Sequence, residues 1–471
     1  MRRVVRLGAA LGGLLTYEAQ AGSVKSLADA EVAGHRPIEE ADPGAGPPFV
    51  LTNGQIWTAE GDVYENGYVV VVNGKIMAVG EGTPPKTDAA KVIDLKGRIV
   101  TPGLIDTHSH LGVYPSPGGR AHSDGNEMTA PTTPGVWAEH SVWPQDPGFG
   151  YALAGGVTAM QLLPGSANLI GGRGFVVQNV PARGARAMAF PGAPSTVKMA
   201  CGENPKRVYG EERKSAPMTR MGNLRGQREA FLEAQAYAEK WRAYEAKQTP
   251  QPRKGREGAQ PDAGSPPERD LDKETLVGIL NGSFLPQVHC YRADDMLAFL
   301  QVADEFGFKV RSFHHALEAY KIRDILAARD VSVSTWADWW GFKLEAWDGI
   351  PENLALVHEA GGRAIVHSDS AVGIQRLNQE AAKAFATGLR AGVKLTPDDV
   401  LRWITIHPAW ALGIDDVTGS ISAGKRADLV VWQGDPLTYT SSADLVFVNG
   451  RLRYDRSQPA PQSDYELGVR P

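Results

Sequence analysis

The stretch GRIVTPGLIDTHSHLG, from Gly97 to Gly112, decides the fold and the chemistry of this chain. A β-branched apolar run ends there in two histidines, His108 and His110, with one residue between them. Side chains two positions apart on a strand project from the same face, so both imidazoles can point at one place beyond the end of the strand. This arrangement is typical of a metal site, although paired histidines also serve as hydrogen-bonded core groups.

Composition predicts a globular protein that acts on small molecules. The 471 residues are 42% hydrophobic and 22% charged, which is enough for a large core and an accessory domain. The formal net charge of −5 is spread without a basic block, which predicts no nucleic-acid partner and no anionic membrane partner. We expect a small-molecule substrate and no membrane span in the mature chain, and self-association into a homo-oligomer stays open.

The first residues have the pattern of a secretory leader. Three arginines within the first six residues precede the apolar run 7–15, and Ala19-Gln20-Ala21 offers a small-x-small cleavage site. We expect a signal peptide over residues 1–21 and a periplasmic or secreted protein. A disordered extension or a misplaced start codon is the alternative.

The two cysteines, Cys201 and Cys290, lie close in sequence to Lys198 and His289, on runs that we interpret as neighbouring strands. Our hypothesis is that they pair after export. Two buried free thiols are the alternative.

The two ends of the chain share one strand-and-turn pattern. Short apolar runs with hairpin signals occupy residues 49–100, with Asn73-Gly74 at one turn. The same pattern returns in SISAGKRADLVVWQGDP and ADLVFVNGRLRYD, with Asn449-Gly450 at another turn. We expect the two ends to form one sheet domain.

Between the ends, strand-like runs alternate with helical patterns, which predicts a parallel sheet. Eight strands would close a barrel. A helix is expected from near Ala293 to Gly307, and a later one is expected to start at Thr396 as N-cap with Pro397 in first position. The eighth strand is expected between Phe175 and Phe190, in addition to the seven runs 99–106, 156–163, 196–202, 285–291, 309–315, 331–336 and 363–369.

Residues 203–272 interrupt this alternation. Phe231, Ala234, Ala238 and Trp241 recur at helical spacing, and residues 251–270 have the composition of a flexible linker. We interpret the segment as an insertion. The helix either covers the active-site mouth or packs on the barrel as a surface appendage.

Six polar residues lie at or near the ends of strand-like runs, two of them after the first run and Lys198 on a later one. The carboxyl ends of parallel barrel strands meet at one mouth, so residues far apart in sequence can converge there. Each residue alone also fits a structural role, but six at strand ends predict a site. They are His108, His110, Lys198, His289, His315 and Asp369.

On these residues, the chain resembles a metal-dependent enzyme of the amidohydrolase superfamily. Within that superfamily it is most similar to the imidazolonepropionase-like branch, and in particular to the exported members of that branch. The resemblance covers nearly everything after about Pro48. It implies an α/β fold, with a TIM-like (β/α)8 barrel over 103–414 and a composite β-sandwich from 48–102 and 415–456. It also implies metals held by the HxH pair of the first strand, the two later histidines and Asp369. The motifs that carry it are PGLIDTHSHLG, VKMACGENPKRVYG, VHCYRADDM, FHHALEAYKI, HSDS and GSISAGKRADLVVW.

In binuclear members, a lysine on the fourth strand reacts with carbon dioxide to form a carbamate that bridges two ions, and Lys198 suits that position. Desolvation near cations depresses the pKa of a lysine and favours the neutral amine that this reaction needs. Imidazolonepropionase is mononuclear and lacks the bridge, so the substrate of this chain cannot be inferred from that of imidazolonepropionase. The alternative for Lys198 is a structural or substrate-facing ammonium.

His314 and His315 are adjacent, and strand alternation predicts that they face opposite ways. Alignment of HHALEAYK with the family pattern favours His315 as the ligand and leaves His314 as a neighbour.

Two divalent ions, by default zinc, lower the pKa of bound water from about 15.7 toward about 7. We expect the resulting hydroxide to attack a polarised carbonyl, with Asp369 as the catalytic residue that carries the proton to the leaving nitrogen.

The sequence indicates the residues that contact the substrate less clearly than it indicates the metal ligands. A glycine-rich loop, 165–173, is expected after the second strand, and Arg173 or Arg292 is a candidate for binding a carboxylate. Trp336, Trp339, Trp340 and Trp347 either line a pocket or pack together.

Three functions compete on this sequence. The first is hydrolysis of a non-peptide carbon–nitrogen bond in a cyclic amide or an N-acyl group. The second is a metallo-dipeptidase of the Xaa-Pro type, which needs a charge to anchor the peptide terminus. The third is a non-catalytic scaffold, against which the complete ligand set argues.

Overall fold

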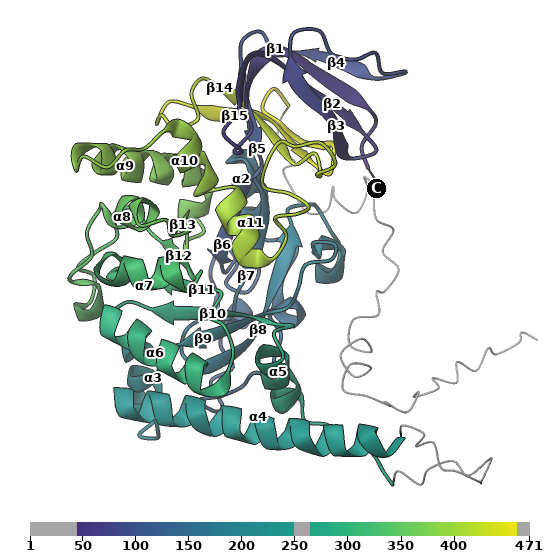
Figure 1. The fold of residues 1–471 in the computed structure, drawn as a ribbon. Coiled ribbons are helices and arrows are strands. Elements are labelled where there is room, and N and C mark those ends of the chain that lie inside the picture. The colour runs from purple at the N-terminus through teal and green to yellow at the C-terminus, as the bar shows by residue number, and fades with distance from the viewer. Residues whose placement is uncertain (1–44, 249–263, 459–471) are drawn as a thin grey trace, which may run out of the picture. The chain divides into compact units, whose positions relative to one another are not determined.

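A computed structural model describes residues 45–248 and 264–458 (Figure 1). The expected signal peptide, 1–21, lies outside the described residues, as does most of the expected linker 251–270. The chain divides into two compact units. One comprises residues 37–239 and 269–471 and holds both sheets, and the other comprises residues 1–36 and 240–268.

An eight-stranded sheet forms a nearly closed barrel, which confirms the predicted α/β barrel. Its strands follow one another in chain order, and β6–β7 and the five strands from β9 to β13 pair in parallel. The strands are β6 (Leu104–Ser109), β7 (Val157–Leu162), β8 (Ile170–Gln178), β9 (Thr196–Ala200), β10 (Leu285–Cys290), β11 (Ser312–His315), β12 (Ser332–Thr335) and β13 (Ala364–Val366).

The eighth strand is β8, and it differs from the prediction in place and direction. It starts at Ile170, inside the segment interpreted as a glycine-rich loop, and it pairs antiparallel with both β7 and β9. The sequence did not predict a strand at this place, because glycine, which occupies positions 171 and 172, has a low β-propensity. Glycine is needed at 172, where φ is +114° and a Cβ would lie 2.5 Å from the Val136 carbonyl oxygen.

The expected strand 99–106 is two strands. β5 (Ile99–Pro102) belongs to the second sheet, and β6 starts the barrel after Gly103. A Cβ at Gly103 would lie 2.0 Å from the Thr158 hydroxyl, so only glycine lets the chain cross from one sheet to the other here.

Helices α6 to α9 cover the outer side of strands β10 to β13 (Figure 1). Both predicted caps are confirmed, because α6 ends at the left-handed Gly307 and Thr396 forms a capping box with Asp399. The insertion contains the predicted helix, α4. The helices are α2 (Pro147–Ala154), α3 (Glu203–Lys206), α4 (Arg220–Gln248), α5 (Leu271–Leu280), α6 (Ala293–Phe306), α7 (Arg323–Ala328), α8 (Asn353–Glu359), α9 (Leu377–Arg390), α10 (Pro397–Arg402) and α11 (Ile406–Leu412).

Shorter helical turns occur between these elements. The 3-10 turns are η1 (Arg120–His122), η2 (Ala138–Ser141), η3 (Ala185–Met188), η5 (Ala319–Ile322), η6 (Leu344–Ala346) and η7 (Gly373–Arg376), and η4 (Arg207–Glu212) is a π-helical turn. Among the described residues, none of the helices combines the length and the apolar character that crossing a bilayer requires.

The second sheet combines both chain ends, as predicted. β5 pairs β1 on one side and β14 on the other, so the N-terminal and C-terminal strands form one sheet. Asn73-Gly74 and Asn449-Gly450 have positive φ at both residues, which is the hairpin turn that their sequences predict. The strands are β1 (Phe49–Trp57), β2 (Val63–Val72), β3 (Lys75–Glu81), β4 (Lys91–Asp94), β14 (Leu429–Gln433), β15 (Ser442–Val448) and β16 (Arg451–Asp455).

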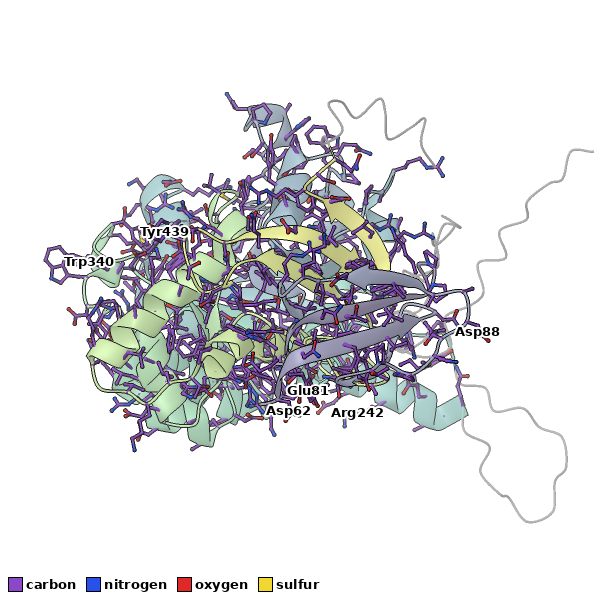
Figure 2. The ribbon with its side chains drawn as sticks, turned by 90° about the horizontal axis from the view of Figure 1, so that it is seen from above. Asp62, Glu81, Asp88, Arg242, Trp340 and Tyr439 are labelled. Carbon is purple, nitrogen blue, oxygen red and sulfur yellow. A yellow bond between two sulfur atoms is a disulfide. The ribbon has the colours of Figure 1, made fainter. Side chains whose placement is uncertain are left out.

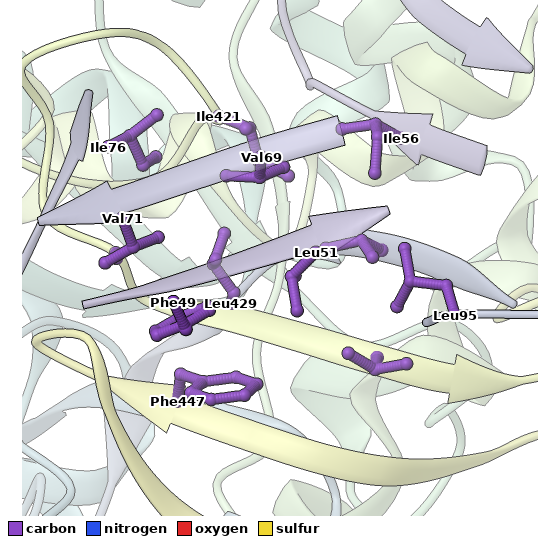
Figure 3. Close-up of a cluster of buried hydrophobic side chains, with 13 residues drawn as sticks. Phe49, Leu51, Ile56, Val69, Val71, Ile76, Leu95, Ile421, Leu429 and Phe447 are labelled. Carbon is purple, nitrogen blue, oxygen red and sulfur yellow. The ribbon is translucent and has the colours of Figure 1, made fainter. Parts of the chain in front are cut away.

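One apolar cluster holds this sheet together (Figure 3). Phe49 from β1 stacks on Phe447 from β15 with ring centroids 4.5 Å apart, and both are buried. Leu51 and Leu429 add to the same cluster. Burial of such side chains contributes about 1.5–3 kcal/mol each, so the two chain ends stabilise each other.

Candidate functional site

All six predicted site residues lie at one end of the barrel, where strands β6, β9, β10, β11 and β13 reach their carboxyl ends. Parallel strands bring those ends together, so the topology accounts for the convergence. Lys198, His108, His289 and His315 are at most 2% exposed, whereas His110 and Asp369 are partly accessible.

Asp369 lies among the histidines. Its Oδ1 is 3.1 Å from His110 Nε2 and 3.6 Å from His108 Nε2, and its Oδ2 is 3.9 Å from His315 Nδ1. Burial alone raises the pKa of the Asp369 carboxyl, but the hydrogen bond from His110 and the electrostatic interactions with His110, His367 and Lys198 bring it below its ordinary value. The carboxylate is therefore ionised and faces the ring nitrogens.

Lys198 is fully buried in β9. Its Nζ lies 3.1 Å from His108 Nε2, and burial lowers the pKa of its amine to about 7. A lysine with such a pKa is largely neutral at slightly alkaline pH, which is the state that nucleophilic chemistry at the amine requires.

Hydrogen bonds fix the tautomer of His108. Gln287 donates its amide N–H to the Ala411 carbonyl at 3.0 Å, which leaves its oxygen to accept from His314 Nε2 at 2.8 Å. His314 Nδ1 must then accept from His108 Nδ1, 2.9 Å away. The remaining nitrogen of His108, Nε2, carries a lone pair and points at Lys198 and Asp369.

The expectation that His314 and His315 face opposite ways is wrong. Both rings lie 4.8 Å from the His108 ring. His315 has a left-handed φ of 69°, and this turn at the end of β11 breaks the alternation that a regular strand imposes. Strain of this kind at a non-glycine residue is common at functional sites.

Within residues 45–248 and 264–458, His289 has no hydrogen-bond partner for either ring nitrogen. Both nitrogens are buried without a hydrogen bond, and the ring lies 4.5 Å from the His315 ring. Burial lowers the pKa of His289 well below its ordinary value, so the ring is neutral. Two unsatisfied buried nitrogens on one histidine are costly, and they indicate a ligand that would occupy them.

Sequence reasoning missed His367, which follows β13 two residues before Asp369. Its Nε2 lies 3.1 Å from His315 Nδ1, and burial lowers its pKa to about 4. Its place in the HSDS motif was the available signal. Among the described residues, two groups have a spacing that could hold a metal ion: the buried group of His108, His314 and His367, and the partly accessible group of His108, His110 and Asp369.

Asp106 and Ser368 were also missed, and they join the two edge strands of the barrel at the site. The Asp106 carboxylate accepts hydrogen bonds from the amides of His108 and Ser368 and from the Ser368 hydroxyl. The Asp369 amide donates to the His108 carbonyl at 2.9 Å. These bonds hold Asp369 against β6.

The two arginines named as carboxylate anchors are engaged in other contacts. Arg173 donates to the Thr275 hydroxyl at 2.8 Å and lies over two aromatic rings. Arg292 pairs with Asp294 at 2.8 Å on the surface. The cysteines do meet, since Cys201 and Cys290 form a disulfide between the ends of β9 and β10.

Comparison with known proteins agrees with this architecture. The amidohydrolase family model matches residues 348–453. A crystal structure of an amidohydrolase from Thermotoga maritima MSB8 has 35% identity and a TM-score of 0.76, covering 87% of this chain and 100% of that one.

Two curated proteins are also similar. Amidohydrolase tasK from Hapsidospora irregularis is 33% identical over 445 residues, and the match covers 88% of this chain but 44% of tasK. This chain therefore spans less than half the length of that relative. An imidazolonepropionase from Fusobacterium nucleatum subsp. nucleatum is 50% identical over 52 residues, which is 10% of this chain and 13% of that enzyme. Because the Thermotoga structure is matched along its whole length at that identity, this chain belongs to the amidohydrolase superfamily.

Proposed function

We propose that the protein is a metal-dependent hydrolase that cleaves a non-peptide carbon–nitrogen bond in a cyclic amide or an N-acyl compound. The observation that carries the proposal is the buried His289, whose two ring nitrogens have no hydrogen-bond partner among the described residues. Five other residues with nitrogen or oxygen donors converge beside it.

The donor set fits divalent metal ions. Ligands of one tetrahedral zinc ion, each about 2.0–2.1 Å from the metal, lie about 3.3 Å from each other. The separations of Asp369 Oδ1 from His110 and His108, 3.1 and 3.6 Å, bracket that value. Imidazole and carboxylate donors favour zinc by default, and they also accept iron, manganese or cobalt.

We assign two ions to six residues. His108, His110 and Asp369 would hold one ion, His289 and His315 would hold the other, and a carbamate on Lys198 would bridge them. The burial of Lys198 and its pKa of about 7 support this assignment, because the free amine must be neutral to react with carbon dioxide. Such bound ions lower the pKa of water and polarise a carbonyl group.

The residues of the chain supply the remaining steps. The Asp369 carboxylate, ionised and held against β6 by the Asp369 amide, accepts the proton of the attacking water and delivers it to the leaving nitrogen. His110 stays oriented because its Nδ1 donates to the Leu163 carbonyl at 2.8 Å.

Substrate screening tests this proposal. The zinc-reconstituted full chain should hydrolyse members of a panel of cyclic amides and N-acyl amino acids, and chelation should abolish the activity. Asp369→Asn should lower kcat by about 100-fold or more while Asp88→Asn, at an exposed carboxylate between β3 and β4, leaves it unchanged. Full turnover by Asp369→Asn with metal bound would refute the role of Asp369.

A metallo-dipeptidase is the second candidate on the same scaffold. It needs a cation for the peptide carboxylate, and the engagement of Arg173 with Thr275 and of Arg292 with Asp294 disfavours it. Turnover of a dipeptide library without turnover of the amide panel would favour it instead.

We also propose that the protein is exported and belongs to the imidazolonepropionase-like branch. The leader-like residues 1–21 and the disulfide support export, because disulfides persist in oxidising compartments. The short imidazolonepropionase match and the PGLIDTHSHLG motif support the branch.

A further inference from the structure

We propose that the loop 336–347, which follows β12, binds an uncharged aromatic group of the substrate. The inference rests on the proposed function, since it places this group beside the metal-binding residues. The loop starts at the carboxyl end of a barrel strand, the end at which all six site residues lie.

Aromatic rings form a continuous stack from the site to the surface. Trp336 stacks on His315 with ring centroids 4.5 Å apart, and Trp339 stacks on Trp336 at 5.0 Å. Phe342 meets the edge of Trp336 at 5.9 Å and contacts Tyr291, which also stacks on His315, at 5.1 Å. The inner rings are buried, whereas Trp339 is 39% and Phe342 is 54% exposed.

Exposed apolar side chains are concentrated in this loop. Trp340 projects from the periphery of the molecule (Figure 2). Within nine residues, five large apolar side chains are between 39% and 83% exposed, which marks a binding surface rather than scattered surface residues. They are Trp339, Trp340, Phe342, Leu344 and Trp347.

Ion pairs fix the loop in this conformation. Glu345 is buried and pairs with Arg220, Lys343 pairs with Glu203 at 3.1 Å, and Asp338 pairs with Lys383 at 2.9 Å. The Gly341 amide donates to the Ala346 carbonyl at 2.9 Å. The rings are therefore held toward solvent before a ligand binds, and binding costs little further ordering.

The surroundings favour an uncharged ligand group. Lys343, Arg220 and Lys383 each pair with a carboxylate, so their charges are neutralised locally. A cavity of about 80 Å³ opens between Trp336, Trp339, Trp340 and Pro351. It is about half the size of a cavity that encloses benzene, so it takes the edge of one ring while the exposed indoles cover its faces.

Hydroxamates with different tails test this inference. Acetohydroxamate, hexanohydroxamate and 4-phenylbutanohydroxamate share one metal-binding group, and their affinities for the zinc-loaded full chain are measured by calorimetry. We expect the affinity of 4-phenylbutanohydroxamate to be at least about 10-fold higher than that of acetohydroxamate. It should also be higher than the affinity of hexanohydroxamate.

Trp339→Ala/Phe342→Ala should abolish the gain from the phenyl tail while leaving the affinity for acetohydroxamate unchanged. The matched control is Tyr439→Ala, another exposed aromatic residue, which should retain the gain (Figure 2).

The outcomes separate the inference from the proposed function. If acetohydroxamate binds but neither tail improves affinity, or both tails improve it equally, the aromatic site is wrong and the metal site stands. If acetohydroxamate fails to bind, both are wrong. A wild-type dimer that the double variant dissociates, with an unchanged preference for the phenyl tail, would assign the loop to self-association and overturn the inference.

Discussion

At the scale of single residues, the site depends on how each histidine uses its two nitrogens. His108 donates from Nδ1 to His314, so its Nε2 lone pair faces the site. His314 in turn donates from Nε2 to the Gln287 side-chain oxygen, which fixes its tautomer. A ligand histidine whose second nitrogen is held in this way has one tautomer and one ring orientation. His314, which is buried beside the proposed ligands, therefore acts as a positioning residue in our assignment.

His314→Leu should weaken metal binding by about 10- to 100-fold, because it removes the acceptor for His108 Nδ1–H. His314→Asn, whose amide oxygen can accept the same hydrogen bond, should recover much of the loss. Competition with a chromogenic chelator measures both affinities, and His140→Leu on the surface is the control. If the two His314 variants bind metal equally weakly, His314 is itself a ligand or a packing residue.

Lys198 should make metal binding depend on carbon dioxide. Metal-free protein reconstituted in buffer depleted of carbon dioxide should take up at most about half of the metal, and added bicarbonate should restore the rest. Mass spectrometry of the native protein should show one added carboxyl group, which Lys198→Met lacks. Equal metal uptake with and without bicarbonate would rule out the bridging carbamate.

At the scale of elements, neighbouring strand ends are joined covalently next to the site. The disulfide between Cys201 and Cys290 closes a segment with a sequence separation of 89 residues and ties β9, which carries Lys198, to β10, which carries His289. Crosslinks that close long segments restrict the unfolded chain most.

Cys201→Ala/Cys290→Ala should therefore lower the free energy of unfolding by about 2–5 kcal/mol. Urea denaturation measures the change. A reductant should destabilise the wild-type chain by a similar amount and leave the double variant unaffected. A wild-type chain that releases two thiols on unfolding without reductant would contradict the pairing.

His407 in α11 should make stability depend on pH. Burial lowers its pKa to about 4, and its Nδ1 donates to the Ala364 carbonyl at 2.9 Å. Above about pH 6.5 the ring is neutral in both the folded and the unfolded chain, so it contributes no pH dependence. As the pH falls from 6.5 to 4, the unfolded chain binds a proton that the folded chain does not, and up to about 3 kcal/mol of stability is lost.

His407→Asn keeps a donor for Ala364 and should reduce this loss. The free energy of unfolding of the two proteins should differ more at pH 7 than at pH 5, in favour of the wild type at pH 7. Parallel pH profiles for the two proteins would show that His407 does not titrate in this range.

At the scale of the whole molecule, the sequence predicts the secondary structure that follows a regular pattern of apolar residues. It does not predict the places where the chain departs from such a pattern. The alternation of strands and helices from β9 to β13, the caps at Thr396 and Gly307, and the two Asn-Gly hairpins follow local rules, and the structure has them. The start and the antiparallel direction of β8 were not predicted, because Gly171 and Gly172, the second of which makes room for Val136, obscure its strand pattern.

In the candidate site, too, some features could be predicted from the sequence and others could not. Strand ends identified the six converging residues, because parallel topology brings such ends together. The role of His314 could not be predicted, since it depends on the left-handed turn at His315 and on the distant amide of Gln287. Tertiary hydrogen bonds of this kind leave no local signal in a sequence.

The proposed function requires metal ions at the carboxyl end of the barrel. Anomalous X-ray diffraction from crystals of the zinc-loaded chain, recorded on both sides of the zinc absorption edge, tests this most directly. We predict two anomalous peaks, one beside His108, His110 and Asp369 and one beside His289 and His315, with density for a carbamate on Lys198 between them. Crystals grown with zinc that show no peak among these residues would contradict the proposed metal site.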